Sequence, residues 1–270
     1  MSRNVRTACP AISRPSPHGF WICIIALAAI SAPATAANLV LNPSFELLNG
    51  ETSSFKVDDP TTDTIPDWTA APTPPNNILA CLVYQGATAQ MCGTLPAGGI
   101  GDNLSLWNVP GGGNGESPDG GNYILADGDS TYSEPLSQTI NGLVTGKQYQ
   151  LSFWQAAGQE KNFGTAGQSM NDTWKVSLGS QNFTGAVMTV AYQGTSAWSL
   201  QKINFTYSGS GASQVLSFLA SSTAPSGNPP FLMLDGVSLV AQAPEPATWS
   251  YLLLTGVSIC LIRKRFRKRA

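Results

Sequence analysis

The sequence predicts an all-β domain that lies between two segments of a different kind. Short runs of alternating apolar and polar residues are separated by Gly, Pro, Asn and Ser, which is typical of strands joined by turns. No long stretch shows the apolar repeat of an amphipathic helix. An uncharged apolar stretch lies near each end of the 270-residue chain. We therefore expect one β-domain at 37–243, preceded by a segment at 1–36 and followed by a segment at 244–270.

The N-terminal segment has the layout of a secretory signal peptide. Three arginines precede an apolar stretch at 20–30, and Ala34-Thr35-Ala36 supplies the small residues of a cleavage site. We expect signal peptidase to cut after Ala36. The alternative is a retained N-terminal anchor, but the apolar stretch is too short for a comfortable membrane span.

The C-terminal segment has three parts in a fixed order. Pro244 and Pro246 prevent helix and sheet hydrogen bonding around Glu245, so this peptide is expected to be extended and accessible. The uncharged run 247–262 would form a helix of roughly 24 Å, a little shorter than a bilayer core of about 30 Å. The Arg/Lys cluster at 263–269 then fixes the C-terminus in the cytoplasm.

A plain single-span anchor would share this composition. The order of Pro244-Glu245-Pro246, short span and terminal basic cluster, however, resembles the PEP-CTERM sorting signal of Gram-negative bacteria that make exopolysaccharide. The resemblance covers residues 244–270. It implies a transient stay in the inner membrane, cleavage near Pro-Glu-Pro by an exosortase, and delivery to the cell surface or extracellular matrix.

Removing both ends changes the charge of the chain. Of the 14 Lys and Arg residues, only five lysines remain in the expected mature domain, whereas all 16 Asp and Glu residues lie between Glu46 and Glu245. With Glu245 retained, the net charge is −11 instead of −2. Such a surface repels nucleic acid, so we exclude nucleic acid as a partner, and it favours solubility and cation binding.

The expected mature domain has neither histidine nor arginine, because the single histidine, His18, lies in the signal peptide. A catalytic Ser-His-Asp or Cys-His site is therefore excluded, as is any metal site that needs imidazole. Cys81 and Cys92 are the two cysteines of this domain, and in an oxidising compartment they are expected to form a disulfide. Two buried free thiols are the alternative.

The expected strands follow one another along the domain with turn residues between them. Two Gly- or Pro-rich stretches, 71–77 and 110–121, are expected to be loops. The expected strands are Leu39–Leu47, Asp67–Ala70, Ile78–Tyr84, Leu104–Trp107, Tyr123–Ala126, Leu136–Ile140, Gln148–Gln155, Thr173–Leu178, Ala186–Val190, Trp198–Tyr207, Gln214–Ala220 and Phe231–Val240. Their number predicts a β-sandwich.

Three patterns resemble galactose-binding-like jelly rolls, a fold that includes several carbohydrate-binding modules. The run Asn38–Glu46 resembles the first strand of that fold, the run Leu136–Trp154 its paired middle strands, and Leu234–Leu239 its closing strand. The resemblance covers most of the domain and implies a jelly-roll β-sandwich. An immunoglobulin-like sandwich is the alternative.

The resemblance also implies a structural Ca²⁺ that joins the first and last strands. Glu46 and Asp235 match the positions of its ligands, and backbone carbonyls, with Asn49 or Glu51, would complete the six to eight oxygens that calcium takes. The alternative is a solvated Glu46 and an Asp235 that begins a turn. Asp127-Gly128-Asp129 also resembles a calcium loop, but the EF-hand's Glu at the twelfth position is missing, so we expect a solvated turn.

One strand has the residues of a sugar-binding face. In Gln148–Gln155, alternation places Gln148, Gln150 and Trp154 on the face opposite Tyr149 and Phe153. An indole can stack on the C–H face of a sugar while amides bond its hydroxyl groups. Lys202, Asn204 and Thr206 of another strand could extend this face. Alternatively, Trp154 is an ordinary core residue, as we expect mainly for Trp68, Trp107, Trp174 and Trp198.

Three functions remain open for the domain. The first is a non-catalytic surface or matrix protein that associates with exopolysaccharide, and the second is a structural surface protein without a ligand. The third is a carbohydrate-active enzyme, which would need two facing carboxylates in a cleft. We expect no enzyme, because Asp127, Asp129, Glu134 and Glu160 lie in turn-like contexts where solvated surface is expected.

Overall fold

The computed structural model describes residues 36–50, 55–57, 65–70, 80–84, 106–108, 116–160, 169–223 and 230–242. These residues contain strands and turns but no helix, which confirms the all-β prediction. None of them belongs to a helix that is long and apolar enough to cross a membrane. The expected signal peptide and the whole sorting segment, including Pro244, Glu245 and Pro246, lie outside the described residues.

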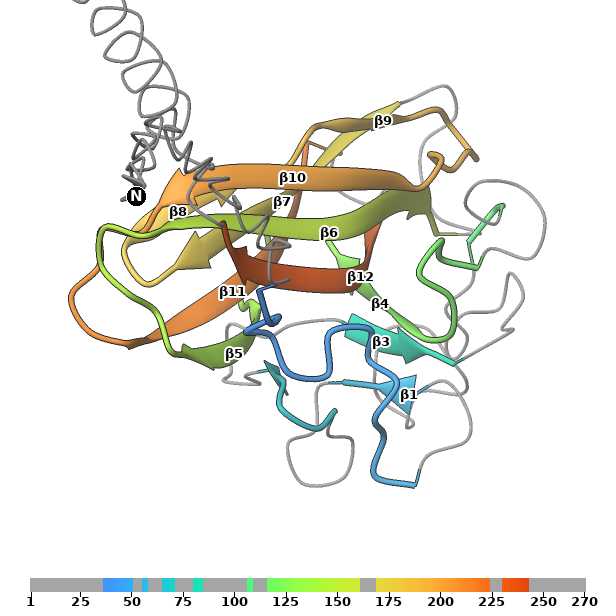
Figure 1. The fold of residues 1–270 in the computed structure, drawn as a ribbon. Coiled ribbons are helices and arrows are strands. Elements are labelled where there is room, and N and C mark those ends of the chain that lie inside the picture. Colours follow the sequence, from blue (N-terminus) through green and yellow to red (C-terminus); the bar gives the residue numbers. More distant parts are fainter. Residues whose placement is uncertain are drawn as a thin grey trace, which may run out of the picture. The chain divides into compact units, whose positions relative to one another are not determined.

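The strands form two antiparallel sheets that pack face to face (Figure 1). Sheet A has the order β1-β3-β4-β12-β6-β10, and sheet B has the order β2-β5-β11-β7-β8, with β9 paired to β7. The strands of sheet A are β1 Phe55–Lys56, β3 Ala80–Val83, β4 Tyr123–Asp127, β6 Gln148–Gln159, β10 Ser199–Thr206 and β12 Pro230–Ala241. Those of sheet B are β2 Thr69–Ala70, β5 Leu136–Asn141, β7 Met170–Leu178, β8 Gln181–Thr184, β9 Met188–Val190 and β11 Ser213–Ser222.

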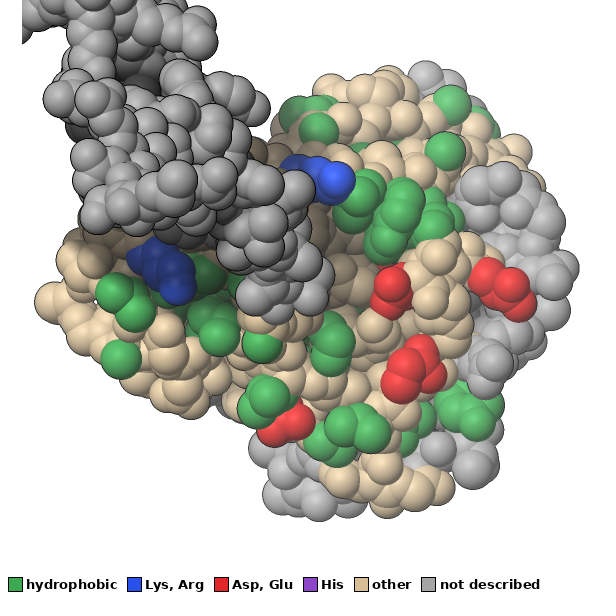
Figure 2. All heavy atoms as spheres, in the orientation of Figure 1, with side chains coloured by type: hydrophobic (Ala, Val, Ile, Leu, Met, Phe, Trp, Pro, Cys, Tyr) green, Lys and Arg blue, Asp and Glu red, His purple; other side chains and the backbone are tan. Residues whose placement is uncertain are grey.

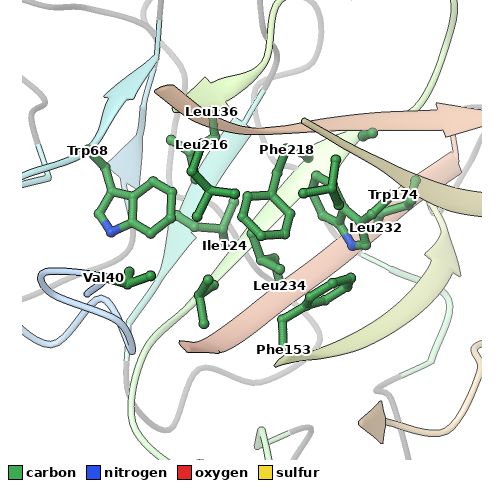
Figure 3. Packing of buried hydrophobic residues seen from close by; sticks show 14 of the residues in the cluster. Val40, Trp68, Ile124, Leu136, Phe153, Trp174, Leu216, Phe218, Leu232 and Leu234 are labelled. Carbon is green, nitrogen blue, oxygen red and sulfur yellow. The ribbon is translucent and has the colours of Figure 1, made fainter. Parts of the chain in front are cut away.

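The main core lies between the sheets, where alternate residues of each strand are buried. Phe218 of β11 is at its centre, with ring centroids 5.2 Å from Phe153, 6.1 Å from Trp174 and 6.3 Å from Trp68 (Figure 3). The indole N–H of Trp174 donates to the Met233 carbonyl of the opposite sheet at 3.1 Å. Trp68 and Trp174 are buried, as predicted. These aromatic contacts and burial fix the two sheets against each other.

A second, smaller apolar cluster covers part of the outer face of sheet A. Along β4, Ile124 belongs to the main core and Leu125 to the second cluster, and along β12 the same holds for Leu234 and Met233. Since neighbouring residues of a strand point to opposite faces, the second cluster lies on the outside of sheet A. The half-buried Trp198 packs against this cluster instead of entering the main core.

Two expectations about connectivity are wrong. The segment 39–47 is not a strand but a series of turns, in which Asn42 and Phe45 have positive φ values of 43° and 57°. The Asn42 side chain stabilises this shape by bonding the backbone N–H of Leu47, and its amide group donates to the carbonyls of Leu47 and Pro66. Such side-chain bonds to nearby backbone compete with strand pairing.

The expected pairing of the two middle strands is the second error. β5 and β6 lie in different sheets: β5 pairs with β2 and β11, whereas β6 pairs with β12 and β10. The turn between them crosses from one sheet to the other, and the N–H groups of Leu143 and Gly146 donate to the carbonyls of Ala212 and Tyr207. Of the expected strand at 104–107, only residues 106 and 107 are described, and Leu106 forms an isolated bridge with Glu160.

Candidate functional site

The outer face of sheet A carries the residues that the sequence singled out for ligand binding. Along β6, Tyr149, Leu151 and Phe153 are buried in the core, so Gln150 and Trp154 project outward and are half-buried, while Gln148 is exposed. The predicted alternation of this strand is therefore confirmed. Figure 2 looks onto this face and shows hydrophobic and acidic side chains next to one another.

The neighbouring strand β10 continues this face in register. Lys202 lies opposite Ser152, and Asn204 lies opposite Gln150, whose amide donates to the Asn204 side-chain oxygen at 2.9 Å. Lys202 and Asn204 are exposed. We call Gln148, Gln150, Ser152, Lys202 and Asn204 the polar strip. It offers amide, hydroxyl and ammonium groups on the outer face of two neighbouring strands.

Trp154 lies at the end of the polar strip, between an apolar and an acidic neighbour. Its partner on β10 is Leu200, which is 39% exposed, and its partner on β12 is Asp235, which is fully buried. Asp235 lies on the same outer face because it follows Met233 of the second cluster at the strand spacing of two. On the far side of Asp235, the buried Tyr123 has its pKa raised by desolvation and then by the Asp235 charge.

Asp235 is the buried member of a group of three carboxyls. Desolvation raises its pKa to about 8, with further contributions from the nearby charges of Asp119 and Glu46, and hydrogen bonds from Ser117 and Gly236 oppose the shift. Oδ1 of Asp235 accepts from the Gly236 N–H at 2.7 Å, while Oδ2 is buried without a hydrogen-bond partner. We call Glu46, Asp119 and Asp235 the Asp235 group.

The turns at residues 41–45 and the loop before β4 place the other two carboxyls, Glu46 and Asp119. Glu46 Oε1 accepts from the backbone N–H of Asn122 at 2.6 Å, and the Asn122 amide donates to the Phe45 carbonyl at 3.0 Å. The Ser44 hydroxyl donates to Asp119 Oδ2. The structure thus brings the predicted residues Glu46 and Asp235 near each other and adds Asp119, which the sequence did not suggest because it lies in a Gly-rich loop.

The fit of a calcium ion depends on more than these side chains. In the described part of the chain, no group of three or more His, Cys, Asp or Glu side chains could by itself hold a metal ion. Main-chain carbonyls and hydroxyls such as those of Ser44 and Ser117 would therefore have to contribute, as the sequence also required. Oδ2 of Asp235 is buried without a hydrogen-bond partner, so either a proton or a cation could satisfy it.

A second group of carboxyls, Asp127, Glu160 and Asp172, lies at the opposite end of β4. All three residues are buried, with exposed fractions of 5%, 9% and 0%, and desolvation raises the pKa of each to about 7. The expectation that Asp127 and Glu160 are solvated is therefore wrong. Their strands end here, and the turn after Asp127 folds back on β11 through the Ser222 N–H bond to the Gly128 carbonyl at 2.9 Å. We call these residues the Asp127 group.

Cys81 is buried in β3 and is disulfide-bonded. Cys92, its predicted partner, lies outside the described residues, so the pairing stays a prediction. Glu51, one of the two residues suggested to complete the calcium shell, also lies outside them, while Asn49 is exposed. Trp107 is half-buried instead of being a core residue, and the buried indole N–H groups of Trp107 and Trp198 have no hydrogen-bond partner.

No protein-family model and no curated protein matches the chain. Among solved structures, TmCBM61 in complex with β-1,4-galactotriose is similar at 14% identity and a TM-score of 0.37, over 77% of this chain and 100% of that one. A putative sugar-binding protein from Bacteroides thetaiotaomicron is similar at 12% identity and a TM-score of 0.36, over 76% of this chain and 100% of that one.

The enzymatically active domain of tailspike protein 4 from bacteriophage CBA120 is similar at 12% identity and a TM-score of 0.34, over 76% of this chain. The chain spans 21% of the length of that tailspike chain. At these identities and TM-scores, the three similarities carry no argument about function, which depends on the geometry described above.

Proposed function

We propose that this chain is an exported, non-catalytic surface or matrix protein whose β-domain contacts exopolysaccharide through Trp154 and the polar strip. The observation that carries the proposal is the half-buried indole of Trp154 on the same outer face of sheet A as the amides of Gln148 and Gln150. An indole that stacks on a sugar ring, next to amides that bond its hydroxyl groups, is the usual chemistry of a sugar site.

The arrangement of the face supports a chain ligand over a small molecule. Together with Trp154, the polar strip extends along β6 from Gln148 to Trp154. At the rise of a strand, this length is about 20 Å. Lys202 and Asn204 widen it by one strand. A strip of this length suits several consecutive sugar units, each of which presents hydroxyl groups to a different amide.

The fold and the sorting of the protein are part of the same proposal. We infer that the two sheets form a galactose-binding-like jelly roll, a reading supported by the closing strand β12, which contains Leu234–Leu239 and is hydrogen-bonded to residues 39 and 43 at the start of the domain. Signal peptidase would release the chain after Ala36, and an exosortase would act near Pro244-Glu245-Pro246 after a transient stay in the inner membrane. The cell surface or extracellular matrix is then the destination.

Calcium would be held by Glu46 and Asp235, with Asp119 as an additional carboxylate. When bound, it would supply positive charge that balances this acidic group. Hydrogen bonds already join residues 39–43 to β12. The Leu39 N–H donates to the Leu239 carbonyl at 2.9 Å, and the Val237 N–H donates to the Pro43 carbonyl at 2.9 Å. A cation here would strengthen that junction.

The Asp127 group favours a carbohydrate-active enzyme as a second candidate function. A carboxyl with a pKa of about 7 can act as a general acid near neutral pH, and the Asp127 charge raises the pKa of Glu160. If this candidate is correct, Glu160→Gln should abolish release of reducing sugar from the polysaccharide. If Glu160→Gln and the unaltered protein both release none, the candidate fails.

Affinity gel electrophoresis with the producer's own exopolysaccharide tests the main proposal. We expect the polysaccharide to retard the protein, and Trp154→Ala to abolish the retardation without unfolding the domain, as checked by circular dichroism. Lys175→Ala on the outer face of sheet B is the matched control and should leave the retardation unchanged. Unchanged retardation of Trp154→Ala would reject this site.

A further inference from the structure

A row of three polar side chains crosses the outer face of sheet A. Ser152 of β6 is the register partner of Lys202 on β10 and of Ser238 on β12. Lys202 and Ser152 belong to the polar strip, and Ser238 also points outward, because its neighbours Val237 and Leu239 pack in the main core. The Cβ atoms of register partners lie about 4.5–5.5 Å apart, so the three side chains are direct neighbours. We call Lys202, Ser152 and Ser238 the Lys202 row.

The polar groups of this row are free to bind a ligand. Lys202 is exposed, and Ser152 and Ser238 are half-buried. Neither the ammonium of Lys202 nor the hydroxyl of either serine forms a hydrogen bond or an ion pair with another described residue. An ammonium donates three hydrogen bonds and accepts none, and each hydroxyl can donate one more. The row therefore offers hydrogen-bond donors and one positive charge, which suits an anionic oxygen.

The charges of this face are separated across the strands. Lys202 is on β10, whereas Asp235 is on β12, two strand spacings or about 10 Å away. The register between β12 and β6 shifts after Asp235 in a β-bulge, where Gly236 has a positive φ of 56°. A Cβ atom at Gly236 would lie 3.0 Å from Cδ1 of Trp154 and 3.1 Å from Cγ of the exposed Asp119. Trp154 on β6 thus lies between the cationic and the acidic part of the face, and Figure 2 shows the Lys and the acidic side chains in separate places.

The position of Lys202 relative to Trp154 suits a charged sugar. The register partner of Trp154 is Leu200, so Lys202 is its diagonal neighbour, at a distance of about 7–8 Å. The lysine ammonium is carried on a flexible four-carbon stem. It can therefore reach a substituent of the sugar ring that stacks on the indole, or of the next unit along the chain.

The donor set favours a carboxylate over a phosphate group. Phosphate is usually bound by arginine forks or by the N-terminus of a helix. The expected mature domain has no arginine, and its described residues contain no helix. One ammonium and a neighbouring hydroxyl match the single charge and the two oxygens of a carboxylate.

We propose that Lys202 and Ser152 form an anion subsite beside Trp154, and that the exopolysaccharide is acidic and places a sugar carboxylate there. The inference rests on the proposed function, because the same polysaccharide stacks on Trp154. Ser238, which lies nearer to the acidic side, bonds a hydroxyl group of the same sugar. The exposed Asp119 repels a second carboxylate at the edge of the indole, so the face selects a polymer in which a neutral sugar adjoins the acidic one.

Affinity gel electrophoresis with two forms of the producer's exopolysaccharide tests this subsite. One form has intact carboxyl groups, and in the other form they have been reduced to alcohols. We expect the intact form to retard the unaltered protein about two- to fivefold more strongly, which is the upper part of the range for an exposed ion pair. Equal or weaker retardation by the intact form would overturn the anion subsite and leave the proposed function standing.

A charge-removing variant assigns the effect to Lys202. Lys202→Gln should be retarded about two- to fivefold less by the intact polysaccharide and as strongly as the unaltered protein by the reduced one. Lys175→Gln is the matched control, because it removes the same charge from an exposed position on the outer face of sheet B, and it should behave as the unaltered protein. No loss in Lys202→Gln, or an equal loss in both variants, would contradict the proposal.

The same gels separate this inference from the proposed function. Trp154→Ala should lose retardation on both forms of the polysaccharide, whereas Lys202→Gln should lose only the advantage of the intact form. If the unaltered protein is retarded by neither form, the proposed function itself is wrong and the anion subsite falls with it.

Discussion

The two acidic groups of this domain contain the same number of carboxyls but are built differently. β4 connects them, with Tyr123 beside the Asp235 group at one end and Asp127 at the other. In the Asp235 group, Glu46 and Asp119 are exposed and only Asp235 is buried. In the Asp127 group all three residues are buried.

This difference decides how each group is expected to be neutralised. An open group with exposed carboxylates can exchange a cation with the solvent, which is why we propose calcium there. In the Asp127 group, whose carboxyls are buried, protonation below about pH 7 is the expected means of neutralisation, because burial disfavours the charged form. The same residue types therefore predict a calcium response at one end of β4 and a proton response at the other.

The largest expected effect is the pH dependence of stability that arises from the Asp127 group. Burial raises the pKa values of Asp127, Glu160 and Asp172 to about 7 from ordinary values of 3.8 for Asp and 4.5 for Glu. The folded protein thus binds more protons than the unfolded chain between about pH 4 and pH 7. The stability from these protons is fully present below the unfolded pKa values and is lost as pH rises through the folded pKa values.

If the three carboxyls contribute independently, we expect the free energy of unfolding to fall by about 8 kcal/mol between pH 5 and pH 8, or about 2.5 kcal/mol for each carboxyl. Urea unfolding at both pH values, in saturating calcium so that the Asp235 group contributes little, measures this. A free energy that stays constant or rises over this range would show that the Asp127 group is ionised in the folded protein.

The next effect is the change in stability when one member of the Asp127 group, Asp172, loses its ionisable carboxyl. Asp172 is fully buried, its Oδ1 accepts from the Ser222 hydroxyl at 2.5 Å, and its Oδ2 has no partner. Asp172→Asn keeps the accepting oxygen and removes the ionisable group. We expect it to stabilise the protein by about 2 kcal/mol at pH 8, with little effect at pH 5, because the carboxyl is already neutral there.

Glu116→Gln, an exposed carboxyl on the loop before β4, is the matched control and should change stability little at either pH. Comparing the two variants by urea unfolding separates the effect of removing a buried carboxyl from the effect of removing one negative charge from the protein. If both variants shift stability equally, the pH dependence comes from the overall negative charge and not from the enclosed group.

The sequence predicted most strands because the alternation of buried and outward residues can be recognised within a single strand. Alternation along Gln148–Gln155 correctly separated the buried Tyr149 and Phe153 from the outward Trp154. The same local reasoning failed where the decisive partner is remote. The run 39–47 resembles the first strand of a jelly roll, but Asn42 bonds backbone groups, including the Pro66 carbonyl, that hold it in turns.

The candidate site was predictable only in part, for the same reason. The resemblance paired Glu46 with Asp235, and the structure places them near each other. Asp119 could not be found, because nothing in a Gly-rich loop indicates that it reaches the Gly236 bulge. Asp127 and Glu160 look like turn residues, yet each is buried by the convergence of strand ends from two sheets, which no single stretch of sequence reveals.

The smallest expected effect is the loss of one hydrogen-bonding amide from the polar strip, at Gln150. Gln150 lies two outward positions from Trp154 along β6, and its amide donates to Asn204 at 2.9 Å on a half-exposed surface. Gln150→Ala should weaken retardation on the exopolysaccharide about two- to fivefold, because one net hydrogen bond contributes about 0.5–1 kcal/mol. Its circular dichroism spectrum should be normal, since Gln150 projects from the outer face of β6 and not into the core. Asn182→Ala, on an exposed position of β8 in sheet B, should change neither property. A Gln150→Ala variant that is retarded as strongly as the unaltered protein would show that the amides of the polar strip do not contact the exopolysaccharide.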